Sequence, residues 1–416
     1  MPTDHDKSVI RPLAEKVAEI AQDPHQQERA RMWQRLNDLD PERPMVRIYQ
    51  IPWREMDVEG ELTLECEEDA ARAVEWNLRQ TIYRWKHFPA DMVVEPVYPV
   101  SYAINSTGYG MHADVEAIPH DSRGGVSAKH YRCQIADEKD VEKIQMPELS
   151  HDREATRARR EWMEDLLGGV LSVEVRGKVA HNYAPWDRLA EWMSPNQILI
   201  DLISRPEFLH AAMERLTGAY EHEMDQLEEM NLLSIADGNY GVGQGGLGYT
   251  DELPQDDCDL QHPRLRDQWG GAMAQIFSEV SPVMHEEFAL KYEKRLLDRF
   301  GLSYYGCCEP LHKKVDVIAR NLPNLRKISM SPWVDAEEGA EAIDGRFVFS
   351  FKPNPAFLAP DGTWDKKDAR RELERTLDAA AGCPVELILK DISTVRFEPR
   401  RLWEWAEMAM EVVEGR

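Results

Sequence analysis

The sequence predicts an α/β fold, most simply a single (β/α)8 TIM barrel, because short apolar runs alternate with helical segments along most of its 416 residues. About eight of these runs are predicted to be strands, and such alternation is typical of a parallel sheet covered by helices. No internal repeat and no linker rich in Gly, Ser or Pro divides the chain. We therefore expect one barrel domain over residues 45–416, with loop insertions, preceded by a helical extension over residues 1–44.

The first half of the chain begins with a charged helix over residues 8–39, where apolar residues recur at helical spacing and Pro41 follows the last turn. A second strong helix over residues 206–230 begins at Pro206, because proline is well tolerated in a first turn. The other predicted elements of this half are strands at 45–51 and from 92 to 98, helices at 67–86 and 152–167, and a strand-like run that leads into His181.

Strands and helices alternate more regularly in the second half. Ser281 and Pro282 predict the start of a helix that runs to residue 300, because Ser is favoured at the N-cap and Pro at the first helical position. The other predicted strands are 232–236, 302–305, 327–331, 347–351 and 385–389, and the other predicted helices are 311–321, 336–343, 367–381 and 399–413.

The chain is strongly acidic, with 50 Lys and Arg against 76 Asp and Glu and a net charge of −26. This charge repels phosphate backbones and anionic lipids, which argues against nucleic-acid and membrane-surface binding. No segment approaches the roughly 18 apolar residues of a membrane span, and the start has no apolar core of a secretory signal. We expect a cytoplasmic protein whose six cysteines are reduced thiols.

Polar side chains follow the predicted strands, where a parallel barrel carries its active site. The alternative is that these residues cap helices or lie in surface loops, and for any one of them that alternative is favoured unless the barrel is assumed. The candidate site residues are His181, Asp237, Tyr305, Glu309, Lys352, Asn354, Lys390 and Asp391.

The sharpest local feature is the pair of adjacent thiols, Cys307 and Cys308, directly after the strand predicted at 302–305. Glu309 follows them, and together they offer the soft and borderline ligands that Zn²⁺ favours. A catalytic zinc takes about three protein ligands, and Asp391 or Cys383 would supply a further one. The alternative, which the pattern leaves equally open, is that both cysteines are small buried hydrophobes.

Residues 241–248 form a loop with five glycines. It resembles a phosphate loop only in glycine content, because it lacks the Gly-Lys-Ser/Thr ending and the spacing of a dinucleotide fingerprint. We expect a loop over the barrel mouth that is either flexible or closely approached by other groups.

Four stretches resemble the uroporphyrinogen decarboxylase superfamily: residues 205–209, 281–288, 305–308 and 329–331. The similarity extends over roughly residues 140–414 and implies an (α/β)8 barrel, in agreement with the strand count. The true decarboxylases of this superfamily grip their tetrapyrrole with an Arg-rich motif around an Ala-Gly step. This chain lacks that motif, so tetrapyrrole decarboxylation is disfavoured.

The other branch of the superfamily comprises corrinoid-dependent methyltransferases, in which a His-x-Cys motif and a later Cys bind zinc. Cys307 takes the place of the motif's Cys, Tyr305 that of its His, and Asp391 falls near the later Cys. The chain has no corrinoid-binding motif, so the resemblance implies a corrinoid carried on a separate protein. It also suggests a homodimer.

Our first hypothesis is a methyltransferase that moves a methyl group between a small methylated substrate, such as an O-methyl compound, and a corrinoid protein. Zinc on Cys307 and Cys308 would polarise the departing group. One alternative is a metal-independent decarboxylase or lyase that holds a small carboxylic acid on Lys352 or Lys390, and another is a non-catalytic barrel that binds a ligand. The catalytic candidates are Tyr305, Glu309 and Asp237, and the substrate-binding candidates are His181, Lys352, Asn354, Lys390 and Asp391.

Overall fold

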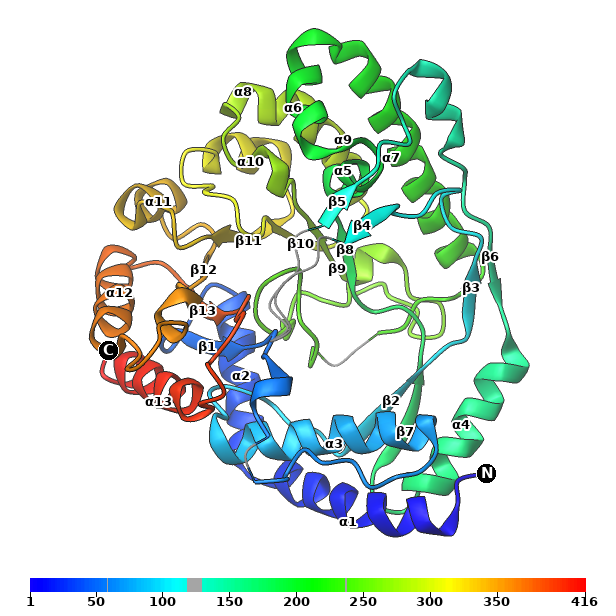
Figure 1. Cartoon of the computed structure of the whole chain (residues 1–416), viewed down its shortest axis with the longest axis vertical. Coiled ribbons are helices and arrows are strands. Elements are labelled where there is room, and N and C mark those ends of the chain that lie inside the picture. Colours follow the sequence, from blue (N-terminus) through cyan, green and yellow to red (C-terminus); the bar gives the residue numbers. More distant parts are fainter. Residues whose placement is uncertain (58, 118–128, 236–237) are drawn as a thin grey trace.

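The computed structural model describes residues 1–57, 59–117, 129–235 and 238–416. Its centre is a seven-stranded parallel sheet in the order β1-β13-β12-β11-β10-β9-β8. The sheet curls into a half-barrel, with helices along its outer side (Figure 1). The predicted α/β class is thus confirmed. The strands are β1 (Met45–Ile48), β8 (His181–Tyr183), β9 (Trp269–Ala272), β10 (Leu302–Tyr305), β11 (Leu325–Met330), β12 (Val348–Phe351) and β13 (Val385–Leu389).

The register of the sheet brings the carboxyl ends of its strands to one edge. Ile48 at the end of β1 pairs with Leu389 at the end of β13, and Met330 pairs with Phe351 in the same way. The loops that follow these strands therefore begin side by side, which is how a parallel sheet assembles a site from distant parts of a chain.

Helices of the second half alternate with these strands, and their apolar stripes explain why they pack on the sheet. Capping side chains set where such helices begin. At the start of α11, the Asp335 carboxylate accepts the backbone N–H groups of Glu337 and Glu338. The helices of this half are α8 (Pro282–His285), a π-helical turn (Glu286–Leu290), α9 (Lys291–Leu297), α10 (Val315–Asn321), α11 (Ala336–Ile343), α12 (Lys366–Ala379) and α13 (Arg400–Glu414).

The first half adds helices and three two-stranded sheets around the half-barrel (Figure 1). The helix predicted over residues 8–39 is two helices, because Pro24 cannot continue the hydrogen-bond ladder. The helices are α1 (Asp4–Ala21), α2 (His25–Asn37), α3 (Asp69–His87), α4 (Arg153–Leu167), α5 (Pro185–Met193), α6 (Pro195–Ser204) and α7 (Pro206–Glu229). The small sheets pair β2 (Val97–Ser101) with β7 (Ser172–Arg176), β3 (Ile104–Ser106) with β6 (Leu149–His151), and β4 (Val115–Ala117) with β5 (Lys129–Tyr131).

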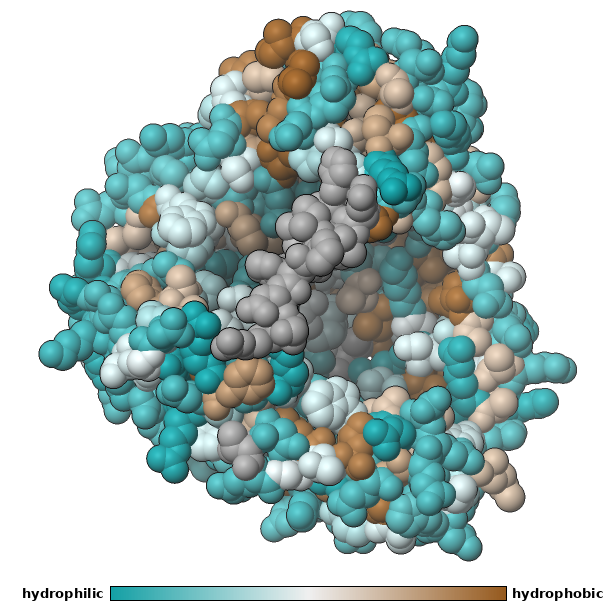
Figure 2. Space-filling model, in the orientation of Figure 1, coloured by the Kyte–Doolittle hydropathy of each residue, from teal (hydrophilic) through white to brown (hydrophobic). Residues whose placement is uncertain are grey.

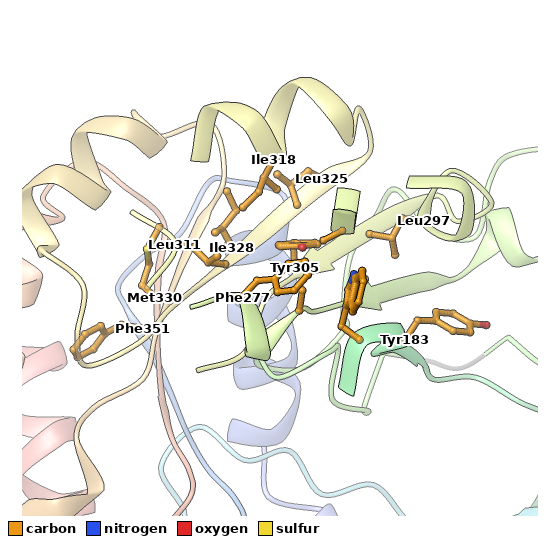
Figure 3. Packing of buried hydrophobic residues seen from close by; sticks show 14 of the residues in the cluster. Tyr183, Phe277, Leu297, Tyr305, Leu311, Ile318, Leu325, Ile328, Met330 and Phe351 are labelled. Atoms are coloured by element: carbon orange, nitrogen blue, oxygen red, sulfur yellow. The ribbon is translucent and has the colours of Figure 1, made fainter. Parts of the chain in front are cut away.

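The main core lies between the sheet and its outer helices. Figure 3 shows Tyr305, Ile328 and Met330 from β10 and β11 beside Ile318 of α10, with Phe277 close by. Burying each such side chain contributes about 1.5–3 kcal/mol. The N-terminal segment is tied to the sheet as well, because Trp33 of α2 packs in one cluster with strand residues that include Met45 and Ile388.

Two strand predictions differ from the structure. The prediction also missed β9 of the main sheet and the short strands β3, β4, β5 and β6. Residues 92–94 form no strand. Of the run predicted at 232–236, residues 232–235 are described, and they contribute one bridge, between Leu233 and Lys178. In the main sheet the missed strand is β9, whose sequence Trp-Gly-Gly-Ala consists mostly of residue types that are depleted in strands. A Cβ on Gly270 would lie 2.4 Å from the Phe300 ring. Packing against neighbouring side chains, rather than the strand propensity of its own residues, therefore determines this strand. The described sheet ends at β1 and β8, which do not pair with each other.

No helix in the described part of the chain is long and apolar enough to cross a membrane.

Candidate functional site

The two adjacent thiols lie at the carboxyl edge of the sheet, just after β10. Gly306 adopts a φ of +100°, and a Cβ there would lie 2.4 Å from Leu311, so only glycine fits this turn. Because the chain has already left the strand, the side chains of Cys307 and Cys308 do not alternate between faces. Their sulfurs lie 3.4 Å apart.

A lysine ammonium from the end of β13 completes this arrangement. Lys390 Nζ lies 3.2 Å from Cys307 Sγ, 3.2 Å from Asp391 Oδ2 and 3.2 Å from Gln244 Oε1. Cys308 Sγ also lies 3.3 Å from Asp391 Oδ2, so its single S–H has two acceptors within reach, this carboxylate and Cys307 Sγ. We call Cys307, Cys308, Lys390, Asp391 and Gln244 the Cys307 cluster.

The charges within the cluster favour a thiolate on Cys307. The hydrogen bond from Cys308 lowers the pKa of Cys307, burial opposes this, and the Lys390 charge lowers the pKa further, so that it lies below its ordinary value. The same hydrogen bond, together with burial, holds the pKa of Cys308 well above its ordinary value. Burial alone would lower the pKa of Lys390, but the anionic groups around it raise that pKa. The cluster therefore favours a thiolate on Cys307 beside a thiol and an ammonium, the environment of a reactive cysteine.

Glu309, a predicted catalytic residue, is fully buried beneath the thiols. Its Oε2 accepts the backbone N–H of Cys307 over 2.7 Å, and its Oε1 accepts that of Ala274 over 3.3 Å. Ser329 Oγ donates to the carbonyl of Cys307 over 2.5 Å. These bonds fix the backbone that carries the reactive sulfur.

Tyr305, the second predicted catalytic residue, points into the core between sheet and helices (Figure 3). Its hydroxyl donates to Glu293 Oε2 over 2.6 Å and lies 2.7 Å from His285 Nε2. Burial raises the pKa of Glu293 to about 8 and lowers that of His285 to about 3, so both are neutral at pH 7. Its catalytic role stays a prediction, since no hydrogen bond of the described residues links its side chain to the cluster.

Charged side chains also fill the inside of the half-barrel, between the strands. Lys327 Nζ and Glu386 Oε2 are 2.9 Å apart, and both side chains are inaccessible to solvent. Lys352 Nζ donates to Tyr304 OH over 2.6 Å and to the carbonyl and hydroxyl oxygens of Ser350 over 2.9 and 2.7 Å. Burial lowers the pKa of Lys352 to about 7.

Both lysines predicted to bind substrate are already engaged. An ammonium has three N–H groups, and Lys352 and Lys390 each have three partners within 3.2 Å. A substrate carboxylate would have to displace one of these partners.

The glycine-rich loop packs tightly against these interior groups. A Cβ on Gly243 would lie 2.4 Å from the Tyr304 ring, and one on Gly245 would lie 2.5 Å from Glu386 Oε1. The expected close approach is thus confirmed, although the partners are strand side chains rather than a bound phosphate. Between these glycines, Gln244 Oε1 accepts hydrogen bonds from Lys390 and from Tyr49 OH.

The remaining predicted residues lie elsewhere. His181 is buried in β8, with its Nε2 2.7 Å from Gln268 Oε1. Asn354 caps a 3-10 turn, where its Oδ1 accepts the N–H of Ala356. No hydrogen bond of the described residues joins His181 or Asn354 to the Cys307 cluster. Asp237 lies outside the described residues.

The cluster does not fit the zinc site that the resemblance implies. Across residues 1–57, 59–117, 129–235 and 238–416, no three His, Cys, Asp or Glu side chains are placed to hold a metal ion. The ammonium of Lys390 lies between the Cys307 sulfur and the Asp391 carboxylate, where a bound cation would have to sit. The residue at the histidine position, Tyr305, points into the core.

The sequence-based prediction missed several groups of the interior and the cluster. Lys327 and Glu386 lie within apolar strand runs. A charged residue in such a run indicates a buried ion pair, because a charge in the protein interior needs a partner there. Gln244 and Tyr49 carried no comparable signal, since their role depends on how a loop meets a distant strand.

No known protein-family model matches the chain, and no curated protein matches its sequence.

Proposed function

We propose that this chain is a methyltransferase that moves a methyl group between a small methylated substrate, such as an O-methyl compound, and a corrinoid carried on a separate protein. The proposal includes a (β/α)8 barrel of the uroporphyrinogen decarboxylase type. The observation that carries it is the Cys307 sulfur, 3.2 Å from the Lys390 ammonium at the carboxyl edge of the parallel sheet.

In the proposed reaction, the Cys307 thiolate attacks the methyl carbon of the substrate. A sulfur–carbon bond forms as the carbon–oxygen bond breaks, and the bonding electron pair leaves with the oxygen. The Cys308 hydrogen bond and the Lys390 charge lower the pKa of Cys307, which favours the thiolate, the reactive form of cysteine. In this role the ammonium replaces the zinc of the methyltransferase branch.

The departing oxygen needs a proton, and Cys308 is the nearest acid to the reacting sulfur. The charge of Cys307 and its hydrogen bond raise the pKa of the Cys308 thiol. Once Cys307 becomes a neutral thioether, that charge is gone, so Cys308 releases its proton more readily. The Asp391 carboxylate, 3.3 Å from Cys308 Sγ, is a second acceptor to which the thiol can turn when Cys307 loses its charge.

A corrinoid, when bound, would supply the nucleophile that takes up the methyl group. For that step the Cys307 sulfur must leave as a thiolate, and the Lys390 ammonium stabilises the charge that develops on it. The same pair therefore assists methyl transfer in either direction.

The lyase alternative is less well supported by the contacts of the two lysines. Lys352 or Lys390 would have to hold a substrate carboxylate, yet each already has three partners. Turnover of a small carboxylic acid at full rate by a Cys307→Ser, Cys308→Ser protein would favour the lyase over the methyltransferase.

The test uses methylcobalamin as methyl donor under anaerobic conditions, with loss of its visible absorption as the readout. We expect the wild-type protein to demethylate methylcobalamin. The Cys307→Ser protein should do so at least about 100-fold more slowly, which is the lower end of the rate loss expected when a catalytic group is removed. Cys383→Ser, a change of a partly buried thiol on the far side of β13, is the matched control. Equal rates in wild type and Cys307→Ser would overturn the proposal.

Elemental analysis of untagged protein separates the lysine-assisted mechanism from a zinc mechanism. We expect far less than one zinc per chain after dialysis against a zinc-containing buffer. Stoichiometric zinc that disappears in the Cys307→Ser, Cys308→Ser protein would restore zinc as the activating cation.

A further inference from the structure

A separate cavity of about 190 Å³ lies between β1, the end of α3 and residues 239–247. Figure 2 shows the face in view hollowed near its centre, on the inner side of the curled sheet. The polar lining of the cavity includes two arginines, Arg47 from β1 and Arg84 from the last turn of α3. Cys307 and Lys390 do not line it.

Neither arginine has an acidic partner in the described part of the chain. Arg47 donates to the carbonyl of Gly245 over 2.5 Å, and Arg84 donates to that of Ile48 over 3.2 Å. The Nε atom of Arg84 is buried and has no hydrogen-bond partner at all among the described residues. A buried donor without an acceptor is costly, so the described residues do not satisfy this guanidinium in full.

The nearby carboxylates are already neutralised. Asp91 is the one acidic residue of the described lining, and Arg43 binds both of its oxygens, over 2.6 and 3.0 Å. Glu386 is held by Lys327 and by Ser350. Among the described residues, the cavity lining therefore carries an excess of positive charge.

The two guanidinium groups are also close enough to repel each other. Burial and the positive charge of Arg47 lower the pKa of Arg84 to about 10, so it remains charged at neutral pH. Two like charges in one partly buried place are unfavourable unless an anion joins them.

The orientation of Arg47 is fixed by its surroundings. A Cβ on Gly241 would lie 2.6 Å from Arg47 Nη1, so the guanidinium packs directly on the glycine backbone. On another side it stacks over Tyr49, with 4.8 Å between the guanidinium carbon and the ring centroid. A guanidinium held in this way presents a rigid fork of donors, which matches the oxygens of a carboxylate or a phosphate.

We propose that this cavity, the Arg47–Arg84 pocket, binds a small oxyanion, namely the carboxylate or phosphate group of a small molecule, through both guanidinium groups. Its volume lies below the roughly 300–1,000 Å³ of pockets that hold drug-sized ligands, so the ligand has few heavy atoms. The site is distinct from the Cys307 cluster. The glycine-rich loop joins the two, because Arg47 binds Gly245 and the preceding Gln244 binds Lys390.

Calorimetric titration tests this proposal without any methyl transfer, so its result is independent of the proposed function. The probes are inorganic phosphate and malonate, titrated separately at constant ionic strength, with chloride as the non-chelating control. We expect saturable binding of at least one probe to the wild-type protein, and the stronger probe identifies the ligand class. No saturable binding of either probe would overturn the proposal.

Variants of Arg84 and Arg47 locate the binding. Arg84→Gln removes the charge, whereas Arg84→Lys keeps the charge and loses the fork, so we expect affinity to fall at least about tenfold in the first and by less in the second. Arg31→Gln, an exposed change on α2, should leave binding unchanged. Circular dichroism and the melting temperature establish that each variant is folded. Wild-type affinity in folded Arg84→Gln and in folded Arg47→Gln would contradict the pocket.

Discussion

The Lys390 ammonium lies 3.2 Å from the Cys307 sulfur, although the two residues come from the ends of different strands. The pair forms because β10 and β13 are parallel members of one curled sheet, so their carboxyl ends open on the same edge. A cation at this distance from a buried thiol favours its ionised form. The chemistry proposed for the protein depends on this one contact.

Replacing Lys390 should make Cys307 less reactive at neutral pH. In the wild-type protein the pKa of Cys307 is lowered. Its alkylation by methyl iodide should therefore already be rapid at pH values below those at which an ordinary thiol ionises. In Lys390→Gln the pKa rises, and the midpoint of the rate against pH should shift to higher pH. Peptide mass spectrometry of the alkylated protein measures this shift.

Lys366→Gln, a change of an exposed lysine on α12, is the control and should keep the wild-type profile. Superimposable profiles for Lys390→Gln and wild type would show that the ammonium does not influence the thiol.

The interior ion pair should matter most when only one partner is removed. Lys327→Met leaves Glu386 as a buried carboxylate without its main partner, and such a change typically lowers the free energy of unfolding by about 3–5 kcal/mol. Lys327→Met combined with Glu386→Leu should lose less. Denaturant unfolding measures both, and a single variant as stable as wild type would contradict the pairing.

The stability of the protein should depend on pH through Glu293. Its pKa in the folded protein is raised to about 8, so folding takes up a proton between the ordinary pKa of a glutamate and pH 8. Glu293 therefore makes its full contribution to the free energy of unfolding of the wild-type protein at low pH. This contribution is lost as the pH rises through that window. Glu293→Gln removes the dependence.

The difference in unfolding free energy, Glu293→Gln minus wild type, should thus increase from pH 5 to pH 9, by an amount on the order of a few kcal/mol. The exposed neighbour Glu287 offers the control, since Glu287→Gln should show no such trend. A flat difference for Glu293→Gln, measured by urea unfolding at several pH values, would show that the carboxyl is not held in its neutral form.

A methyl group added to the glycine-rich loop should destabilise the fold. Gly243 has a φ of +53°, and its added Cβ would lie 2.4 Å from the Tyr304 ring, so Gly243→Ala should lower the free energy of unfolding by about 1–3 kcal/mol. Gly218→Ala is the matched control, because its Cβ would approach only Met146, at 3.9 Å. In the helix α7 that change should stabilise the protein by about 1 kcal/mol. A loss of stability in Gly218→Ala and none in Gly243→Ala would reverse the expectation.

Most of the fold in the second half follows from local patterns. Residues 385–389 and 336–343 were predicted with the bounds that the structure has, because apolar runs and caps mark them clearly. The strand β9 could not be predicted, since two glycines leave no periodic signal and only the packing of Phe300 against Gly270 selects it. The pairing of β2 with β7 outside the main sheet likewise depends on tertiary contacts.

The site was predictable in its location and less so in its composition. Strand ends pointed to Cys307, Cys308, Lys390 and Asp391, which the structure brings together. The same reasoning placed Tyr305 beside them, but the last residue of β10 faces the helices, whereas the turn at Gly306 redirects the two cysteines after it. A one-residue difference in where a strand ends decides which face a side chain takes, and the sequence pattern does not resolve it.

The most direct test of the account is to find where a transferred methyl group resides. The protein is incubated anaerobically with methylcobalamin and without a further methyl acceptor, then digested and mapped by peptide mass spectrometry. We expect the mass of one methyl group on Cys307 in the wild-type protein, and none on any cysteine in Cys307→Ser. Consumption of methylcobalamin with Cys307 unmodified, or a methyl group on Cys308 instead, would contradict Cys307 as the sulfur that receives it.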